Sequence, residues 1–303
     1  MIVAAVDAQT LVDALGLGAV YALMAVGIGL VFGVLRLVNF AYGQLVMAGA
    51  YTLAFTSGWP VAGSILACFA VVVALSLAME RAVFRPLRTH SPAVMLVTTF
   101  AVAFLLQAVA LMLDVRDGTI GEPAGSLASL NEVVGLGGVD IRKVTILAVA
   151  VAAVALGLLA LLLGRTTIGL QMRAASADFR TARLLGVKAD TVIGVAVLLS
   201  GVLAAAVAVI LTVQFPLVSP DFALRDTIVV LVGVVVGGID RLWTATLGGF
   251  VIGFATGVIN GALPTDKTVF LPTAVFALVV LVLLLRPGGL FAPVGRATAV
   301  DRV

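Results

Sequence analysis

The sequence predicts an all-α membrane protein, a polytopic bundle of eight or nine transmembrane helices. Of its 303 residues, 62% are hydrophobic and only 11% are charged, less than half of the roughly 25% charged residues typical of soluble domains. The mean hydropathy is +1.26. The apolar residues form runs that approach or exceed the roughly 20 residues that a helix needs to cross the hydrocarbon. We therefore expect one integral-membrane domain over residues 1–303.

The expected crossings follow from the apolar runs in chain order. They are residues 11–34, 39–57, 61–79, 93–113, 144–163, 191–213, 227–239, 243–259 and 269–285. The amino-terminal segment lacks a Lys/Arg region and carries Asp7 and Asp13, so we expect it to be retained and not cleaved as a signal peptide. Residues 227–239 are short for a crossing and predict a re-entrant or broken helix, which leaves the count at eight or nine.

Lysines and arginines predict the sidedness of the bundle. Most of the 18 basic residues fall on one side if the loops alternate across the membrane, and that side is the cytoplasm by the positive-inside rule. We therefore expect the amino terminus outside and the carboxy terminus in the cytoplasm of a bacterial plasma (inner) membrane. Because the basic residues are scattered over short loops, we read them as topology signals and do not expect a nucleic-acid partner.

Two loops are expected on the outer side. Residues 114–143 are rich in Gly, Ser, Asp and Glu and form the main extracytoplasmic loop. This loop is either a docking surface for an extracytoplasmic partner or a plain solvated connector. Residues 214–225 contain two prolines and Asp221 and predict a structured loop near the transport path.

Glycines predict close helix packing. The 32 glycines include Gly233, Gly237, Gly249, Gly253 and Gly257, spaced one helical turn apart within each group. In lipid, small residues allow helix backbones to approach closely. The spacing therefore predicts tight helix–helix contacts, and a sliding face for alternating access is the second reading.

Polar residues at the start of one apolar run mark a candidate substrate pathway. Asn39, Tyr42 and Gln44 fall within six residues, with Gly43 among them. Irregular backbone at membrane depth is tolerated only where it is buried in protein or lines a cavity. Asn and Gln can bind a zwitterionic or amide solute without a buried net charge. The alternative is that Asn39 only caps a helix at the membrane interface.

Several chemistries are not expected. The sequence has no G-x4-G-K-[ST] motif for nucleotide phosphates, so any ATP hydrolysis belongs to another chain. It has one cysteine and one histidine, and we expect no catalytic residue, no metal site and no cofactor. No charged residue falls clearly inside an expected span, and this absence argues against an ion-coupled carrier.

Residues 165–188 form the one long polar, helix-prone segment of the chain. They carry five basic residues against one acid, Asp178. An Ala-rich run with Gly169 and Gly186 near its ends favours a short surface helix between flexible residues. Such a helix suits docking on a cytoplasmic partner. The alternative is that its arginines hold the loop in the cytoplasm through lipid headgroups.

Four sequence motifs resemble one known family. Residues 39–51, NFAYGQLVMAGAY, are similar to the NFAHG-x-x-x-M-x-G-A-Y signature of permease subunits of branched-chain amino-acid (Liv-type) ABC importers. Residues 169–187 resemble the family's cytoplasmic coupling loop, residues 233–253 its glycine-rich block, and residues 286–292 its RP-x-GLFG ending. The chain departs from the family pattern at Tyr42, where His is common, and at Asp240, where Gly is common.

The resemblance implies a permease that transports branched-chain or related apolar amino acids and is not itself an enzyme. Its implied partners are two cytoplasmic ATPase subunits, a second related permease, an extracytoplasmic solute-binding protein and the lipid bilayer. The implied coupling-loop residues are Gly169, Arg173, Ala174, Arg180 and Gly186. Related permeases for urea or short-chain amides keep the substrate open, and a stand-alone secondary carrier is the remaining alternative.

Overall fold

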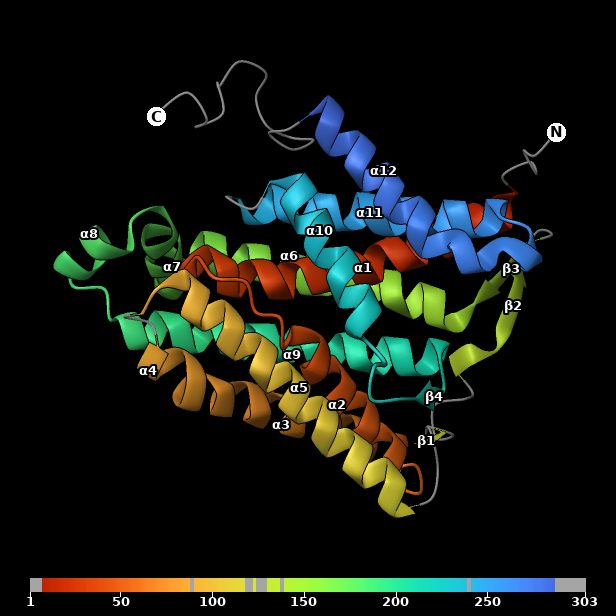
Figure 1. Cartoon of the computed structure of the whole chain (residues 1–303), viewed down its shortest axis with the longest axis horizontal. Helices are drawn as coiled ribbons and strands as arrows, with labels where there is room; N and C mark the ends of the chain where they lie inside the picture. The colour runs from red at the N-terminus through yellow and green to blue at the C-terminus, as the bar shows by residue number, and fades with distance from the viewer. Residues whose placement is uncertain are drawn as a thin grey trace.

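The computed structural model describes residues 7–87, 90–117, 122–123, 130–136, 139–238 and 241–286. Within these ranges the chain is a helical bundle, as predicted (Figure 1). Its first half contains α1 (Ala8–Leu35), α2 (Tyr42–Phe55), α3 (Val61–Met79), the π-helical turn η1 (Glu80–Phe84), α4 (Arg85–Leu87), α5 (Pro92–Asp117), β1 (Glu122–Pro123), β2 (Val133–Leu136) and β3 (Val139–Arg142). Its second half contains α6 (Lys143–Arg165), α7 (Thr167–Ala177), α8 (Phe179–Leu184), α9 (Ala189–Gln214), β4 (Leu217–Val218), α10 (Leu224–Gly237), α11 (Leu242–Ala262), the 3-10 turn η3 (Thr265–Phe270) and α12 (Leu271–Leu285).

Seven helical segments of the described chain are long and apolar enough to cross a membrane. They are α1, α3 with its extension to Leu87, α5, α6, α9, α11, and α12 with the turn before it. The remaining two predicted crossings, residues 39–57 and 227–239, become α2 and α10, each of 14 residues. A helix of that length spans about 21 Å at 1.5 Å per residue, short of the roughly 30 Å hydrocarbon core. The second of these segments is short for a crossing, as expected, but it is one continuous helix, so its re-entrant or broken character stays a prediction. The first is shorter than predicted.

Helix α1 forms the centre of the bundle. Within its most apolar stretch 83% of the residues are buried, and the corresponding share is 67% in α9 but 11% in α12. Because an apolar helix satisfies its backbone hydrogen bonds internally, it can lie in protein or in lipid. Helices α1 and α9 are therefore the inner helices, and α3, α5, α6 and α12 present apolar side chains to the bilayer.

Glycines set the distances between the inner helices, which confirms the packing prediction. A Cβ on Gly257 of α11 would overlap the Cα of Ala14 of α1, and one on Gly253 would lie 2.9 Å from the Cα of Gly18. Between α10 and α11, a Cβ on Gly237 would lie 2.9 Å from the Cα of Gly248. Side chains at these positions would displace backbone, so the three helices can approach this closely only because the residues are glycine.

The two ends of the bundle differ in structure. Helices α7 and α8 extend from one end, and the strands lie at the other (Figure 1). There β2 and β3 form an antiparallel hairpin in which Val133 pairs with Arg142, and β1 pairs with β4. Within the predicted loop 114–143, the hairpin leads directly into α6. Its base is closed by an ion pair of 2.5 Å between Lys143 Nζ and Glu132 Oε2, and this hydrogen bond lowers the pKa of Glu132.

Candidate functional site

The two short helices meet through their first turns. A Cβ on Gly43 of α2 would overlap the hydroxyl of Thr227 of α10 and would lie 3.1 Å from the carbonyl oxygen of Ala223. The Thr227 hydroxyl in turn donates a hydrogen bond of 2.7 Å to the Ala223 carbonyl. Gly43 therefore allows the start of one short helix to press against the start of the other.

This meeting point lies near the middle of the membrane. The Tyr42 hydroxyl packs against Gly27 of α1, and Asp226 of α10 bonds to Tyr21 of α1. Residues 21 and 27 fall within the central half of α1, the 28-residue helix at the centre of the bundle. Converging short helices at mid-depth are a general feature of membrane transport sites, because their free helix ends and irregular connections supply polar groups where regular helices supply none.

A cavity of about 360 Å³ opens beside this junction, between α2, α5 and α10. Its volume lies near the lower end of the roughly 300–1,000 Å³ range of small-molecule pockets. The Phe40 and Phe100 rings stack in its wall with centroids 4.0 Å apart. The lining residues are Phe40, Gln44, Phe100, Ala103, Phe104, Gln107, Leu224, Thr227, Ile228 and Leu231. The cavity is thus mainly apolar and aromatic, with two amides and one hydroxyl.

Gln44 is the predicted pathway residue that lines this cavity. It is only 1% exposed, and its Oε1 atom has no hydrogen-bond partner among the described residues. Buried polar atoms in native proteins are nearly always hydrogen-bonded, and an unpaired one is costly. An unpaired acceptor beside a cavity is the arrangement expected where a ligand donor completes the bond.

The other two predicted pathway residues occupy packed positions. Asn39 is 3% exposed, and its Oδ1 accepts a 3.1 Å hydrogen bond from the backbone N–H of Ala41. It therefore shapes the turn that leads into α2. Tyr42 is fully buried and faces Gly27 of α1. Neither residue lines the cavity beside Gln44, and a contact of either with substrate stays a prediction.

An acidic residue lies level with the middle of α1, just before the expected span 227–239. The Tyr21 hydroxyl donates a 2.9 Å hydrogen bond to Asp226 Oδ1, at the middle of α1. Asp226 follows the exposed Arg225 in the first turn of α10. The physical reason is that residues 215–223 return into the bundle, so that α10 starts inside it and not at its surface. The predicted structured loop at residues 214–225 pointed to this place, but the sequence did not show that Tyr21 would pair with the acid.

Residues 165–188 form two helices where the sequence predicted one. Helix α7 begins after Thr166, whose hydroxyl accepts the N–H of Gly169 at 3.0 Å. It ends before Asp178, which caps α8 by accepting the N–H of Thr181 at 3.1 Å. Because Asp178 competes for backbone N–H groups, it separates the helices. Arg173 and Arg180 therefore lie on different helices and do not share one helical face.

The two glycines of this segment have different roles. A Cβ on Gly169 would overlap the backbone of Leu162, so this glycine is a close-packing residue at the corner between α6 and α7. It is not the flexible boundary that we expected. Gly186 has φ +92°, a left-handed conformation that favours glycine, and it ends α8. Arg173 and Ala174 are exposed on α7, whereas the Arg180 side chain lies outside the described residues.

The segment is attached to the end of α1 through Arg36. The Arg36 guanidinium donates a hydrogen bond to the carbonyl oxygen of Ser176, near the carboxyl end of α7. Arg36 itself has φ 55°, which turns the chain at the end of α1 toward residues 37–41 and α2. Within the described part of the chain, no three His, Cys, Asp or Glu residues gather as a metal site.

Comparison with known proteins identifies the family. The model described as "Branched-chain amino acid transport system / permease component" matches residues 10–286. The high-affinity branched-chain amino acid transport system permease protein BraD of Pseudomonas aeruginosa is 31% identical over 297 residues, which cover 93% of this chain and 94% of the relative. The corresponding permease proteins LivH of Escherichia coli and of Salmonella typhimurium are each 26% identical over 296 residues, with the same coverage. No solved structure matches. The chain therefore belongs to the permease-component family of branched-chain amino acid transport systems.

Proposed function

We propose that the chain is the membrane-spanning permease subunit of an ABC importer for branched-chain or related apolar amino acids. The observation that carries the substrate class is the cavity beside the first turns of α2 and α10, with Gln44 in its wall. The buried Oε1 atom of Gln44 has no hydrogen-bond partner among the described residues. An apolar amino acid combines a hydrocarbon side chain with an ammonium and a carboxylate. The phenylalanine-lined cavity suits the side chain, and the Gln44 oxygen can accept from the ammonium.

The surroundings of the cavity suit a zwitterion. The first turn of α10 carries Arg225 and Asp226, one charge of each sign, next to the cavity residue Thr227. Peptide dipoles add positive potential at helix starts. Urea or a short amide would use the amide side chains of Gln44 and Gln107, but it would leave the three cavity phenylalanines without an apolar partner. The lining therefore favours an apolar amino acid over a small amide.

We propose that ATP is hydrolysed by two separate cytoplasmic subunits that dock on α7 and α8. Leu184 and Leu185, at the end of α8, are 84% and 81% exposed beside the exposed Arg183 and Lys188. Exposed leucines flanked by charges are typical of a protein-docking surface. A shift of α7 would be passed through the Arg36–Ser176 hydrogen bond to the end of α1 and then to the start of α2. A rigid-body movement of the docking surface would reach the cavity through this connection.

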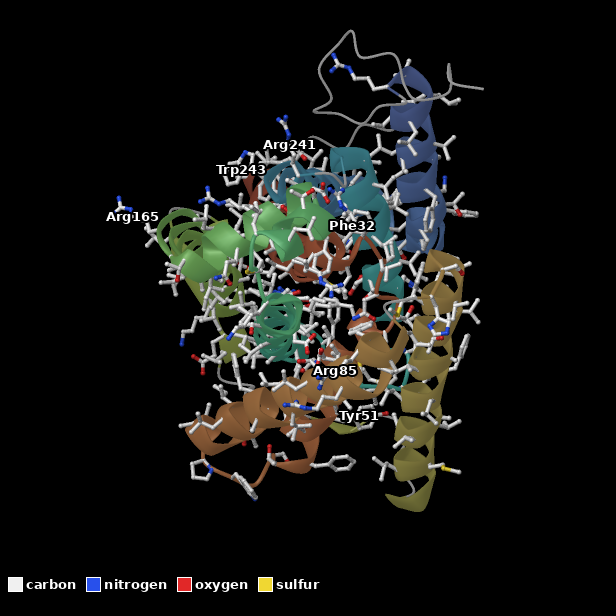
Figure 2. The ribbon with its side chains drawn as sticks, turned by 90° about the vertical axis from the view of Figure 1, so that its left-hand side faces the viewer. Phe32, Tyr51, Arg85, Arg165, Arg241 and Trp243 are labelled. Carbon is white, nitrogen blue, oxygen red and sulfur yellow. The ribbon has the colours of Figure 1, made fainter. Side chains whose placement is uncertain are left out.

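The proposed orientation places the α7 end of the bundle in the cytoplasm. Arg85, Arg165 and Arg241 extend from this end in Figure 2. Because Lys and Arg accumulate in cytoplasmic loops, the amino terminus lies outside and the carboxy terminus inside. The β2–β3 hairpin then lies on the outer side, where an extracytoplasmic binding protein would dock. A second, related permease would complete the transporter.

Uptake in proteoliposomes tests the proposed function. The chain is co-expressed with its genomic neighbours, reconstituted, and assayed for uptake of labelled leucine with and without ATP and the binding protein. We expect uptake that requires both. ATP-driven uptake of urea or an amide in place of leucine would overturn the substrate. Leucine uptake by this chain alone, without ATP, would instead establish a carrier, for which Asp226 would be the membrane-depth acid.

Charged substitutions at the docking surface test the coupling proposal. Leu184→Glu/Leu185→Glu should reduce ATP-dependent uptake at least tenfold, as expected when about 1.4 kcal/mol or more of docking free energy is lost. The chain should still insert, because both side chains are already exposed. Val269→Glu, at an 81% exposed position of η3 and outside both α8 and the β2–β3 hairpin, is the control. Wild-type uptake by the double variant would exclude α8 as the docking surface.

A further inference from the structure

A second cavity lies away from the α2–α10 junction, at the α7 end of the bundle. It has a volume of about 410 Å³ and runs between α1, α6 and α11 beneath α7. Its walls are mostly hydrocarbon, and they carry basic side chains at the mouth. The lining includes Leu156, Leu159, Arg173, Arg241 and Trp243. We call this cavity the arginine groove.

The two arginines of the arginine groove come from distant parts of the chain. Arg173 lies on α7, and Arg241 is the residue before the first turn of α11. Both are exposed, and no acidic side chain among the described residues lines the groove. Neither guanidinium has an ion-pair partner within the described part of the chain. The fold therefore brings two positive charges to the mouth of one apolar groove.

The depth of the groove matches the level of lipid headgroups. Helix α6 ends at Arg165 and α11 begins after Arg241, so the mouth lies where two membrane-spanning helices reach the surface. Trp243, 68% exposed, lies next to Arg241 (Figure 2). Exposed tryptophans at this level are typical of the membrane–water interface. The apolar interior of the groove continues toward the bilayer core along α6 and α11.

We propose that the arginine groove binds an anionic phospholipid. The phosphodiester would pair with Arg173 and Arg241, since guanidinium groups form charge-assisted hydrogen bonds to phosphate oxygens. One acyl chain would lie against Leu156, Leu159 and Trp243. Basic pockets between membrane helices are a general mode of anionic headgroup recognition. Because Arg173 belongs to α7, the lipid would join α7 to α11 and α6. This inference depends on neither the transported substrate nor the ATPase partners.

The tryptophan content of the chain provides a direct assay. The chain has two tryptophans. Trp243 lines the groove. Trp59 lies in the turn after α2. Helix α2 contacts β1 and β4, so Trp59 is at the opposite end of the bundle. In the Trp59→Phe variant of the full chain, all tryptophan fluorescence reports on the groove. Quenching is compared between brominated phosphatidylglycerol and brominated phosphatidylcholine, each added to phosphatidylcholine vesicles. We expect phosphatidylglycerol to quench Trp243 at about thirtyfold lower mole fraction, because the two arginines near the surface each contribute about 1 kcal/mol toward an anionic lipid.

Charge-matched variants separate a specific site from a general electrostatic effect. Arg173→Gln/Arg241→Gln should abolish the preference for phosphatidylglycerol over phosphatidylcholine, because the double variant lacks both proposed phosphate contacts. Arg165→Gln/Arg183→Gln removes the same charge from the same end of the bundle, outside the groove, and should keep the preference. In the Trp243→Phe variant, Trp59 should be quenched equally by the two lipids.

Four results would overturn the proposal. They are equal quenching of Trp243 by both lipids, a preference that survives in Arg173→Gln/Arg241→Gln, an equal loss in the control pair, and the absence of quenching by either lipid. The last result would show that protein and not lipid covers the groove. Glycerol phosphate added as a competitor distinguishes a soluble phosphate from a lipid: its displacement of the quenching lipid at millimolar concentration would also contradict the proposal.

Discussion

Gly248→Leu should prevent the chain from folding in the membrane. Gly248 of α11 faces Gly233 and Gly237 of α10, and a Cβ at this position would overlap the Gly233 carbonyl oxygen and lie 2.6 Å from the Gly237 nitrogen. Overpacking a core typically costs roughly 1–3 kcal/mol when side chains can adjust. Here the overlapping atoms are backbone, so whole helices must separate, and we expect a higher cost.

The effect is measurable as yield and thermal stability. Detergent-extracted protein is analysed by size-exclusion chromatography, and the melting temperature of the folded fraction is recorded. Gly157→Leu is the matched control, because Gly157 is exposed on α6 and a Cβ there would meet nothing within 4 Å. We expect this control to behave like the wild type. Equal yields and melting temperatures for the two variants would contradict the packing described for α10 and α11.

Ala103→Trp should block transport while the protein still folds. Ala103 lies on α5, is 5% exposed and faces the 360 Å³ cavity, so an indole group can occupy the space proposed for the substrate. Ala101→Trp on the same helix points away from the bundle, because Ala101 is exposed. We expect uptake to fall at least tenfold in the first variant, equivalent to about 1.4 kcal/mol or more, and to remain unchanged in the second.

Gln44→Leu at the same cavity should change stability and transport in opposite directions. Leucine removes the unpaired Oε1 acceptor, whose burial costs roughly 1–3 kcal/mol, so we expect the substrate-free protein to melt at a higher temperature. Uptake should fall, because the proposed acceptor for the ammonium is lost. If Gln44→Leu lowered the melting temperature and left uptake unchanged, Gln44 would be a packing residue and the cavity would not be the substrate site.

Much of the fold could be predicted because lipid restricts the backbone to a few solutions. Apolar runs such as residues 144–163 become spanning helices wherever they are long enough, since no other arrangement satisfies their N–H groups. Glycine spacing predicted the close contacts of Gly253 and Gly257, because small residues allow helix backbones to approach closely in lipid. These features depend on local composition, and a single sequence contains that information.

The site depended on contacts between distant residues, which composition does not encode. Gln44 was a candidate from its polarity alone, but its neighbours Phe100 and Thr227 come from other helices. Asp226 lies between the predicted loop at residues 214–225 and the predicted segment 227–239, and nothing local indicates that residues 215–223 return into the bundle. The helix break at Asp178 was predictable in principle, since Asp is a strong helix cap, but the Ala-rich flanks favoured one continuous helix.

The position of α2 has a consequence for biosynthesis. Gly49 of α2 packs on Ala208 of α9, and Gly43 packs on Thr227 of α10. At translation rates of roughly 5–20 residues per second, these partners leave the ribosome about 10–40 s after α2. During that interval the start of α2 has α1 beside it but lacks the cover of α10 at mid-depth, where unpaired polar backbone would be costly. Helix α2 must therefore wait at the membrane surface or beside the insertion machinery, and the late helices complete the insertion of an early one.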